Sequence, residues 1–582
     1  MSSISQSQTE STYTSEVPTA LKAGQLTAEF FRQTGWLRYI RIGDHELARA
    51  IYPTLRGTNW ETISFQVRVI SEEIEENAFS LQIQGESAHP DLQLKWTARI
   101  SGAPNSVITY EMEWMSEEDL RVNRIGLCVL HPASECVAKA CRITGMEGKE
   151  VPAQFPGSIK ADPIFDRPFQ KISYEVGPAV KGEIVFEGGP FETEDQRNWG
   201  DASFKSYTPP SADPKPFKVH SFASSSHKVT VQLAPPAKRV LAILHGKQAQ
   251  FSIATTPVLP LPLIGFDRSA SPQGTIPGEF EFFHISDAGQ IPAFKDWITE
   301  TTSPLHLGIK ISAFTDDQMS DLASWVSPFS SKITLWRLEM EPSARETELQ
   351  LARFQKFAEK IQSRSLLAVG TPFDFMDFNK ASGNAKNGAL PWFGYRPTVH
   401  AEDSTTVMEN IGTLEWLRKS AGNFSPGEVA LGPVRLGIAR SHDLPAAWLV
   451  GFFSIVLKIP GFHSICLAPE DFNTKAISKI LELMAGYRKS LPTLSDHPLQ
   501  ALGFTLLNAK NQKRVFLANL LGVEQPVKLK SGVCKATISR LTLSSLGSSS
   551  PQNGIVESQE AVGAKLEFLL KPWEVLVIDI LE

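Results

Sequence analysis

The stretch that decides the fold runs from Ile333 to Gly370 and reads ITLWRLEMEPSARETELQLARFQKFAEKIQSRSLLAVG. Its apolar run from Ile333 to Leu338 is typical of a buried strand. Ser343 and Glu346 then form an S-x-x-E capping box, which marks the start of a helix. A second strand follows from Leu366 to Val369, and strand–helix–strand order predicts a parallel sheet covered by helices. One face of the helix is apolar, through Leu351, Phe354, Ala358 and Ile361.

The same alternation of strands and helices extends on both sides of this stretch, from residue 256 to residue 492. A helix carrying Met408 and Leu417 ends at Gly422, and a later one carries Ile480 and Met484. Repeated units of this kind predict a (β/α)8 TIM-like barrel, with a doubly wound sheet as the alternative. Further strand-like runs lie at Val258 to Phe266, Leu305 to Ile311, Val429 to Val434 and Ser464 to Leu467.

Outside the barrel the apolar residues alternate with polar ones, which is the pattern of strands. Residues 21–255 predict a large N-terminal β-sandwich, with strands near Leu92 to Ile100, Ile108 to Trp114 and Val229 to Leu233. Residues 493–582 predict a small C-terminal β domain that packs on the barrel, because so small a sheet buries little alone. Residues 1–20 are polar and predict a disordered tail. The fold class is therefore multidomain, α/β plus all-β.

Composition excludes several kinds of partner. The net charge is -6, which provides no basic surface for nucleic acid. The longest apolar run, Ala446 to Leu457, falls short of the roughly 20 residues that span a bilayer, so we expect a buried helix and no membrane contact. The N-terminus has no apolar signal segment, and the five cysteines show no paired spacing. We therefore expect a soluble, cytoplasmic protein with reduced thiols; homo-oligomerisation stays open.

Candidate site residues follow the predicted barrel strands, because barrel enzymes place their sites at the C-terminal ends of the strands. Asp374, Asp377 and Asn379 alternate partly with Phe residues after the strand that ends at Val369. Such spacing suits polar groups that face a cavity between aromatic anchors. It equally suits a loop whose Asp and Asn side chains satisfy turn backbone.

Two further groups of polar residues have two readings each. His400, which follows a strand and precedes Asp403, is a candidate general base or oxyanion donor; the alternative is a hydrogen-bonded His beside a helix cap. Glu339 is a candidate second carboxylate or an acidic residue near a helix N-terminus. The polar stretch Phe191 to Asp201 is either an interface cluster or a loop that closes the barrel mouth.

Several long motifs resemble one family. The stretch from Asn123 to Pro132 and the stretch from Glu194 to Lys205 are similar to the first domain of bacterial D-apionate lactonases. Gly370 to Asn379 resembles the family's G-T…F-x-E-L-N-R segment, and Pro397 to Asp403 resembles its P-x-V-H-A-x-D segment. Gly432 to Arg435 follows in the expected order. The resemblance implies a three-domain hydrolase that opens the five-membered ring of a branched-sugar lactone during apiose breakdown.

Lactone opening requires an activated water, an electrophile and a proton for the leaving alkoxide. On that basis we expect Asp377 or Glu339 to be the general base and His400 to protonate the leaving oxygen or stabilise the oxyanion. Arg435 would bind or polarise the acyl group, and the remaining substrate-binding residues would be Asp374, Asn379, Asp403 and Glu470.

Neither a cofactor nor a metal is expected, since no ligand cluster is visible in the sequence. The partner would be a small-molecule sugar lactone. Two alternatives remain: a glycoside hydrolase that pairs Glu339 or Glu341 with Asp377 or Glu470, and an inactive homologue that binds a sugar or a partner protein.

Overall fold

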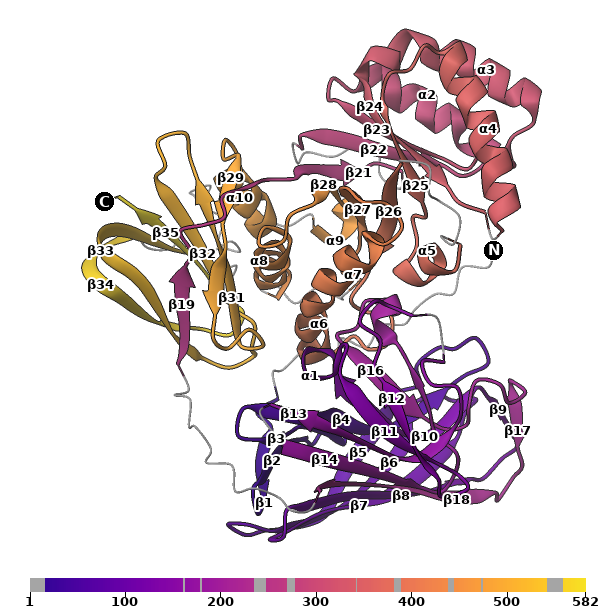
Figure 1. Ribbon diagram of the computed structural model, residues 1–582, viewed down its shortest axis with the longest axis vertical. Coiled ribbons are helices and arrows are strands. Elements are labelled where there is room, and N and C mark those ends of the chain that lie inside the picture. Colours follow the sequence, from indigo (N-terminus) through magenta and orange to yellow (C-terminus); the bar gives the residue numbers. More distant parts are fainter. Residues whose placement is uncertain are drawn as a thin grey trace.

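The structure is a computed structural model of three domains, of which the middle one is a barrel (Figure 1). It describes residues 16–160, 163–177, 180–234, 248–269, 278–341, 343–381, 389–437, 444–472, 475–541 and 558–581. Most of the expected tail, residues 1–15, and the polar loop expected at Ser544 to Gly554 lie outside the described residues.

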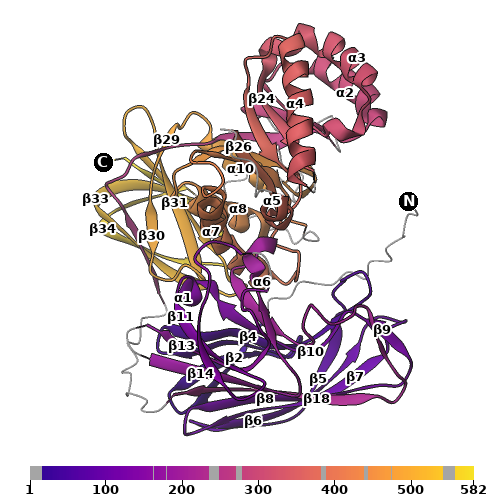
Figure 2. The ribbon, with the colours of Figure 1, turned by 45° about the vertical axis from the view of Figure 1, so that its right-hand side comes forward.

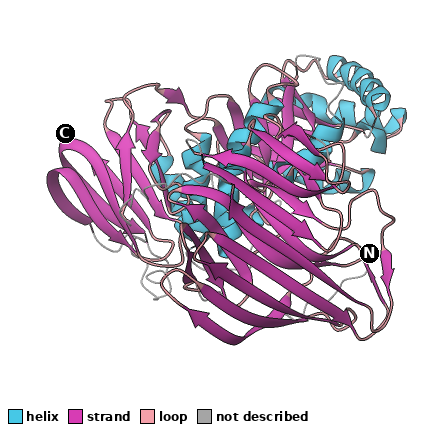
Figure 3. Ribbon diagram, turned by 60° about the horizontal axis from the view of Figure 1, so that its bottom comes forward, coloured by secondary structure: helices cyan, strands magenta, loops and turns pink. Residues whose placement is uncertain are grey.

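The first domain is a sandwich of two large antiparallel sheets, as predicted (Figure 3). The first sheet has the order β1 (Thr19–Ala23), β2 (Leu26–Phe31), β3 (Trp36–Ile42), β4 (His45–Arg56), β10 (Arg124–Pro132), β16 (Ser203–Tyr207) and β15 (Glu192–Glu194). The second has the order β12 (Glu150–Gln154), β11 (Ala140–Gly145), β13 (Phe169–Val176), β14 (Val180–Glu187), β18 (Ser224–Leu233), β8 (Val107–Ser116), β7 (Leu94–Ala103), β6 (Phe79–Ser87) and β5 (Phe65–Ile74). A small ribbon pairs β9 (Leu120–Val122) with β17 (Phe217–Val219).

Period-two alternation is what builds this sandwich. In β7, Leu94, Trp96, Ala98 and Ile100 are buried, while the residues that alternate with them, Lys95, Thr97 and Arg99, are exposed. The inward rows of both sheets form one apolar cluster, which removes a large apolar area from water. The three strands predicted at Leu92 to Ile100, Ile108 to Trp114 and Val229 to Leu233 are therefore confirmed as β7, β8 and β18.

The middle of the chain is a closed barrel of eight parallel strands, so the TIM-like barrel is confirmed over the doubly wound sheet. The strands are β21 (Leu263–Asp267), β22 (Phe280–Ile285), β23 (Leu305–Ile309), β24 (Ile333–Glu339), β25 (Leu366–Gly370), β26 (Leu390–Tyr395), β27 (Val429–Val434) and β28 (Phe462–Leu467). Each pairs in parallel with the next, and β28 pairs with β21 to close the ring.

Helices connect the barrel strands and lie around them (Figures 1 and 2). They are α2 (Ile291–Glu300), α3 (Asp316–Val326), α4 (Ala344–Lys360), α5 (Phe375–Ala381), α6 (Ser404–Glu409), α7 (Thr413–Ala421), α8 (Leu444–Val456), α9 (Pro469–Phe472) and α10 (Lys475–Met484). The Ser343 hydroxyl accepts from the backbone N–H of Glu346, which confirms the predicted cap of α4. The single helix expected through Met408 and Leu417 is instead α6 and α7, separated by a 3-10 turn at Asn410–Gly412.

The third domain receives a strand from a part of the chain that we expected in the first domain. β19 (Ala249–Ile253) pairs in parallel with β33 (Gln525–Leu541) and antiparallel with β30 (Thr493–Ser495). The chain therefore enters the third domain before the barrel, and the boundaries at 255 and 492 do not coincide with the sheets. The other strands are β20 (Leu259–Pro260), β29 (Lys489–Leu491), β31 (Ala501–Leu507), β32 (Lys513–Asn519), β34 (Ser558–Leu570) and β35 (Val575–Ile580).

The third domain packs against α8, which is buried along nearly its whole length. Phe504 of β31 and Phe516 of β32 belong to the same apolar cluster as Phe453 of α8. The run expected as a buried helix at Ala446 to Leu457 thus lies between the barrel and this sheet. No helix among the described residues is long and apolar enough to cross a membrane.

The first domain is joined to the barrel by a buried ionic cluster around Glu409 of α6. Arg38 and Arg49 place guanidinium nitrogens 3.5 and 3.3 Å from the Glu409 carboxylate, and the hydroxyl of Tyr39 donates to it. All of these side chains are buried. Because each buried charge is paired across the interface, the cluster fixes how the two domains meet.

Candidate functional site

The C-terminal ends of the barrel strands present a ring of charged side chains. Seven strands or the loops after them contribute: Asp267 at the end of β21, His284 in β22, Lys310 after β23, Glu339 in β24, Asp374 after β25, Arg396 after β26 and Arg435 after β27. Glu470 follows the eighth strand, in α9. This end of a barrel is where enzymes of the fold bind substrate.

Glu339 lies between Lys310 and His284. Its Oε1 lies 3.0 Å from Nζ of Lys310, and its Oε2 lies 3.0 Å from Nε2 of His284. Burial raises the pKa of this carboxyl, but His284 and Lys310 together outweigh burial and lower it. Glu339 is therefore ionised at neutral pH and accepts protons poorly. Gly308 leaves the space for His284, because a Cβ there would lie 2.6 Å from its Cδ2.

A second cluster joins Asp267, Arg435 and Glu470. Nη2 of Arg435 lies 3.2 Å from Oδ2 of the buried Asp267, and its Nε lies 3.8 Å from Oε1 of the half-exposed Glu470. Burial raises the pKa of Glu470 above its usual value. The structure thus brings two predicted residues, Arg435 and Glu470, together at the mouth and adds Asp267, which sequence reasoning missed.

The pKa of Asp374 is raised toward neutrality. Burial raises it to about 6; Arg396, whose Nη2 lies 3.8 Å from Oδ2, lowers it, while the carboxylates of Asp377 and Asp201 raise it. A group with such a pKa changes its proton state near physiological pH, which is what a general acid or base requires.

Asp377 and Asn379 lie on the helix α5. From the sequence, this segment had two interpretations, polar groups facing a cavity or a loop. Asp377 is exposed, and its backbone N–H donates to the carbonyl of Asp374. Asn379 donates from Nδ2 to Oδ1 of Asn198 at 2.9 Å, across the domain interface. Two apolar residues of the same helix, Phe375 and Phe378, are buried in the barrel core.

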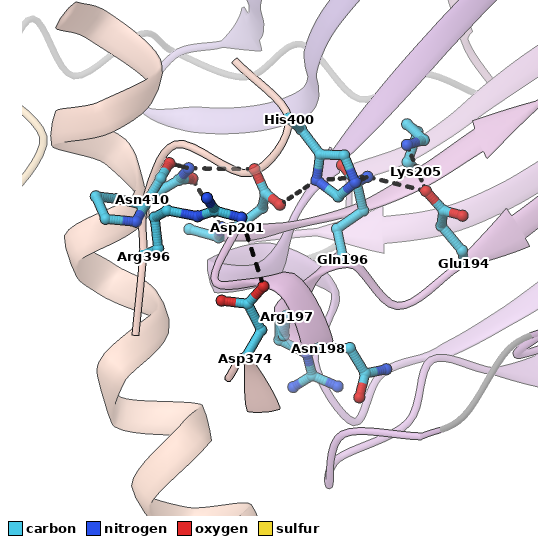
Figure 4. Close-up of polar contacts among 12 residues, drawn as sticks. Glu194, Gln196, Arg197, Asn198, Asp201, Lys205, Asp374, Arg396, His400 and Asn410 are labelled. Atoms are coloured by element: carbon cyan, nitrogen blue, oxygen red, sulfur yellow. Dashed lines mark hydrogen bonds and ion pairs between the residues drawn. The ribbon is translucent and has the colours of Figure 1, made fainter. Parts of the chain in front are cut away.

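His400 contacts the first domain rather than another barrel residue (Figure 4). Its Nδ1 lies 2.5 Å from Oδ2 of Asp201, and the ring is T-shaped to Trp199 with centroids 6.1 Å apart. Burial lowers the pKa of His400 well below its usual value, and the nearby Lys205 and Arg56 lower it further. Asp201 was not among the residues that the sequence predicted for the site.

The stretch Phe191 to Asp201 contains the buried ion pair that one of its two interpretations expected, while closure of the barrel mouth stays a prediction. Asp195 and Arg197 form a buried ion pair within the loop, with Nη2 to Oδ2 at 2.7 Å. The loop also reaches the mouth, where Gly200 adopts a φ of 90° and a Cβ there would lie 3.0 Å from the carbonyl oxygen of Arg396. Only glycine combines that conformation with so close an approach.

Asp403 caps α6, which is the alternative that the sequence offered for it. Its carboxylate accepts from the backbone N–H of Thr406 at 3.0 Å and pairs with Nη2 of Arg38 at 3.1 Å. These contacts occupy both its oxygens, since Oδ2 accepts from the Thr406 hydroxyl. A role for Asp403 in binding substrate stays a prediction.

No three His, Cys, Asp or Glu side chains of the described ranges gather closely enough to hold a metal ion. A hollow of about 570 Å³ lies away from the barrel, on the second sheet of the first domain, where Lys95, Thr97, Glu113 and Met115 face outward. It includes none of the charged residues at the barrel mouth. This hollow therefore lies apart from the charged residues at the barrel mouth.

Asp267, His284, Lys310 and Arg396 are the mouth residues that sequence reasoning missed. The signal that could have found them is position: each stands at or just after the C-terminal end of a barrel strand. β22, which carries His284, was not predicted, because its run FEFFHI is short and aromatic and lacks a clear period.

Comparisons with known proteins agree with the domains seen here. Residues 6–236 match the N-terminal domain of D-apionate lactonase, and residues 335–442 match the TIM barrel domain of the same family. A D-apionate lactonase from Brucella anthropi is 29% identical over 441 residues, which cover 69% of this chain and 70% of that protein.

Solved structures show weaker likeness. A glycoside hydrolase family 44 endoglucanase from Clostridium thermocellum is 10% identical with a TM-score of 0.43, and covers 58% of this chain and 100% of its own. A β-arabinopyranosidase is 8% identical with a TM-score of 0.35, over 96% and 100% of the two chains. The two family models together match more than half of the 582 residues. By its first domain and its barrel, this chain belongs to the D-apionate lactonase family.

Proposed function

We propose that this chain hydrolyses the ring ester of a sugar lactone at the barrel mouth and releases the open aldonic acid. The family membership supports the lactone, and a branched, apionolactone-like ring is the substrate we infer within carbohydrate catabolism. The observation that carries the proposal is Asp374, a carboxyl with a pKa of about 6 beside Arg396 at the end of a barrel strand.

In the reaction that we propose, Asp374 takes a proton from water as the water oxygen attacks the lactone carbonyl. The tetrahedral intermediate then collapses, the ring C–O bond breaks, and the leaving alkoxide receives a proton. Asp374 suits the base better than Asp377, because Asp377 is exposed and Asp374 is largely shielded from water. Glu339, whose pKa is lowered by Lys310 and His284, suits an acceptor of hydrogen bonds from sugar hydroxyls.

Positive charge at the mouth supplies the electrophile. Arg435 extends a guanidinium beside Asp267 and Glu470, with more than a third of its side chain exposed. A guanidinium so placed can bind the developing oxyanion or the product carboxylate through paired N–H donors. His400 provides the proton for the leaving oxygen.

The test is a panel of aldonolactones, branched and unbranched, with aryl glycosides as a second class of substrate. Acid release is followed with a pH indicator, and Asp374→Asn and His400→Gln serve as variants. We expect hydrolysis of lactones by the wild type and a loss of about 100-fold or more in both variants. Hydrolysis of aryl glycosides alone would show that the chain is a glycosidase and not a lactonase. Sugar binding without any turnover would make the chain a binding homologue.

A further inference from the structure

Asp201 and His400 come from different domains and contact each other at the barrel mouth (Figure 4). Asp201 is buried, and its Oδ1 accepts from Nδ2 of Asn410 at 3.1 Å while Oδ2 lies 2.5 Å from Nδ1 of His400. Asn410 is itself held, since the same Nδ2 donates to the carbonyl of Pro397 at 2.8 Å. The carboxyl therefore has one fixed orientation toward the imidazole.

The backbone of His400 is fixed by the first domain as well. Its carbonyl oxygen accepts from the Thr62 hydroxyl at 3.1 Å and from Nη2 of Arg56 at 3.4 Å. The amide nitrogen of Gln196 lies 3.3 and 3.4 Å from the two ring nitrogens. Asp201 lies closer to Nδ1, at 2.5 Å, than Gln196 lies to either ring nitrogen. We therefore assign Nδ1 to Asp201, which leaves Nε2 as the nitrogen that can exchange a proton with a ligand.

We propose that Asp201 is a positioning residue that keeps the proton of His400 on Nε2, and that His400 gives this proton to the leaving oxygen. The first domain thereby completes the barrel's active site. When Asp201 is protonated, its O–H donates to Nδ1, and the neutral imidazole carries its proton on Nε2. As Nε2 gives that proton to the alkoxide, the proton of Asp201 moves to Nδ1 and leaves a carboxylate. After the product leaves, solvent protonates Nε2, and the proton on Nδ1 returns to the Asp201 carboxylate. This inference rests on the proposed lactone hydrolysis.

Burial keeps the proton on Asp201 at the pH where it is needed. Burial raises the pKa of Asp201 to about 7, while burial lowers that of His400. Below that pH the pair holds the Nε2–H tautomer; above it the carboxylate accepts Nδ1–H and Nε2 can no longer donate. The other titratable groups that act on the pair are Tyr52, Arg56, Arg124, Glu194, Lys205, Asp374 and Tyr395.

Asp201→Asn tests the relay with little change of shape. The amide oxygen keeps the Asn410 contact, so the amide nitrogen faces Nδ1 and donates to it without being able to release a proton. We expect kcat at about pH 6 to fall by roughly 100-fold or more, and the wild-type decline through pH 7 to vanish. A lower rate with the decline at pH 7 retained would show a merely structural role and overturn the proposal.

Asp195→Asn is the matched control, because Asp195 is a buried carboxylate of the same loop that pairs with Arg197 and not with His400. We expect this variant to keep the decline through pH 7, whatever its rate.

A second measurement needs no turnover. In ¹⁵N-histidine spectra of the full chain, with His400→Gln to identify the signal, we expect His400 to pass from Nε2–H to Nδ1–H as pH rises through about 7. An Nδ1–H tautomer throughout would overturn the relay. If no lactone is hydrolysed but the tautomer of His400 switches, the proposed reaction is wrong, while the proton coupling between Asp201 and His400 is supported.

Discussion

Arg396 and Asp374 lie at the ends of neighbouring barrel strands, with Nη2 3.8 Å from Oδ2. Burial raises the pKa of Asp374, and the guanidinium of Arg396 limits this rise, so that the pKa is about 6. A catalytic base at this position would operate in a range of pH that its neighbours determine, and each neighbour can be tested separately.

Arg396→Met removes the restraining charge. The pKa of Asp374 should then rise above about 6, and the acidic limb of kcat/KM should move to higher pH, because a base acts only when it is deprotonated. A pH profile of lactone hydrolysis measures this shift. Lys380→Met removes an exposed charge from the end of α5 and should leave the limb in place. A limb that stays put in Arg396→Met would separate Asp374 from the proton transfer.

Asp377→Asn distinguishes the two carboxylates of this segment. Asp377 raises the pKa of Asp374, so its neutralisation should move the acidic limb to lower pH while most of the activity remains. Asp374→Asn, in contrast, should cost about 100-fold or more and remove the limb. Rates and profiles for both variants decide the assignment. The reverse pattern, with Asp377→Asn inactive, would return the base to Asp377.

Much of the architecture was accessible from the sequence because it depends on local period. The alternation in β7 and β8 and the capped helix α4 each bury one face of a regular element. β19 could not be assigned, because its alternation does not say which sheet it joins, and its partner β33 lies more than 270 residues later. The barrel was recognisable without β22, since the remaining strand–helix units already implied the closed sheet.

The candidate site was predictable only where one strand end carries its own polar residue. Glu339, Asp374 and Arg435 were found in that way, and the structure places all three at the mouth. The pairing of Asp201 with His400 joins residues 199 positions apart in two domains, and no local pattern announces such a contact. The pKa of Asp374 likewise arises from burial and from Arg396, both of which appear only after folding.

Glu339→Gln should reveal how the ion pairs with Lys310 and His284 stabilise the barrel. The folded pKa of Glu339 lies below its ordinary value of 4.5, so its stabilisation is present above that value and is lost as pH falls through the folded pKa. The variant should be less stable near neutral pH by about 1–3 kcal/mol and should converge with the wild type in acid. Thermal unfolding across pH measures this. A difference that persists unchanged in acid would contradict an ionic cause.

Glu409→Gln should weaken the contact between the first domain and the barrel. The carboxylate lies 3.5 Å from Arg38 and 3.3 Å from Arg49, all three side chains being buried, and its removal leaves two guanidinium groups with less compensating charge. Breaking a buried pair by removing one partner costs about 3–5 kcal/mol. We expect a lower unfolding midpoint and faster proteolysis between the domains.

Glu482→Gln provides the contrast for that measurement, because Glu482 is mostly exposed and pairs with Lys479 at 2.9 Å on α10. Exposed pairs contribute little, so the free energy of unfolding of this variant should stay within about 0.5 kcal/mol of that of the wild type. If Glu409→Gln were as stable as this control, the ionic cluster would not be what holds the domains together. Activity should fall with stability in Glu409→Gln, since the same interface carries Asp201 to His400.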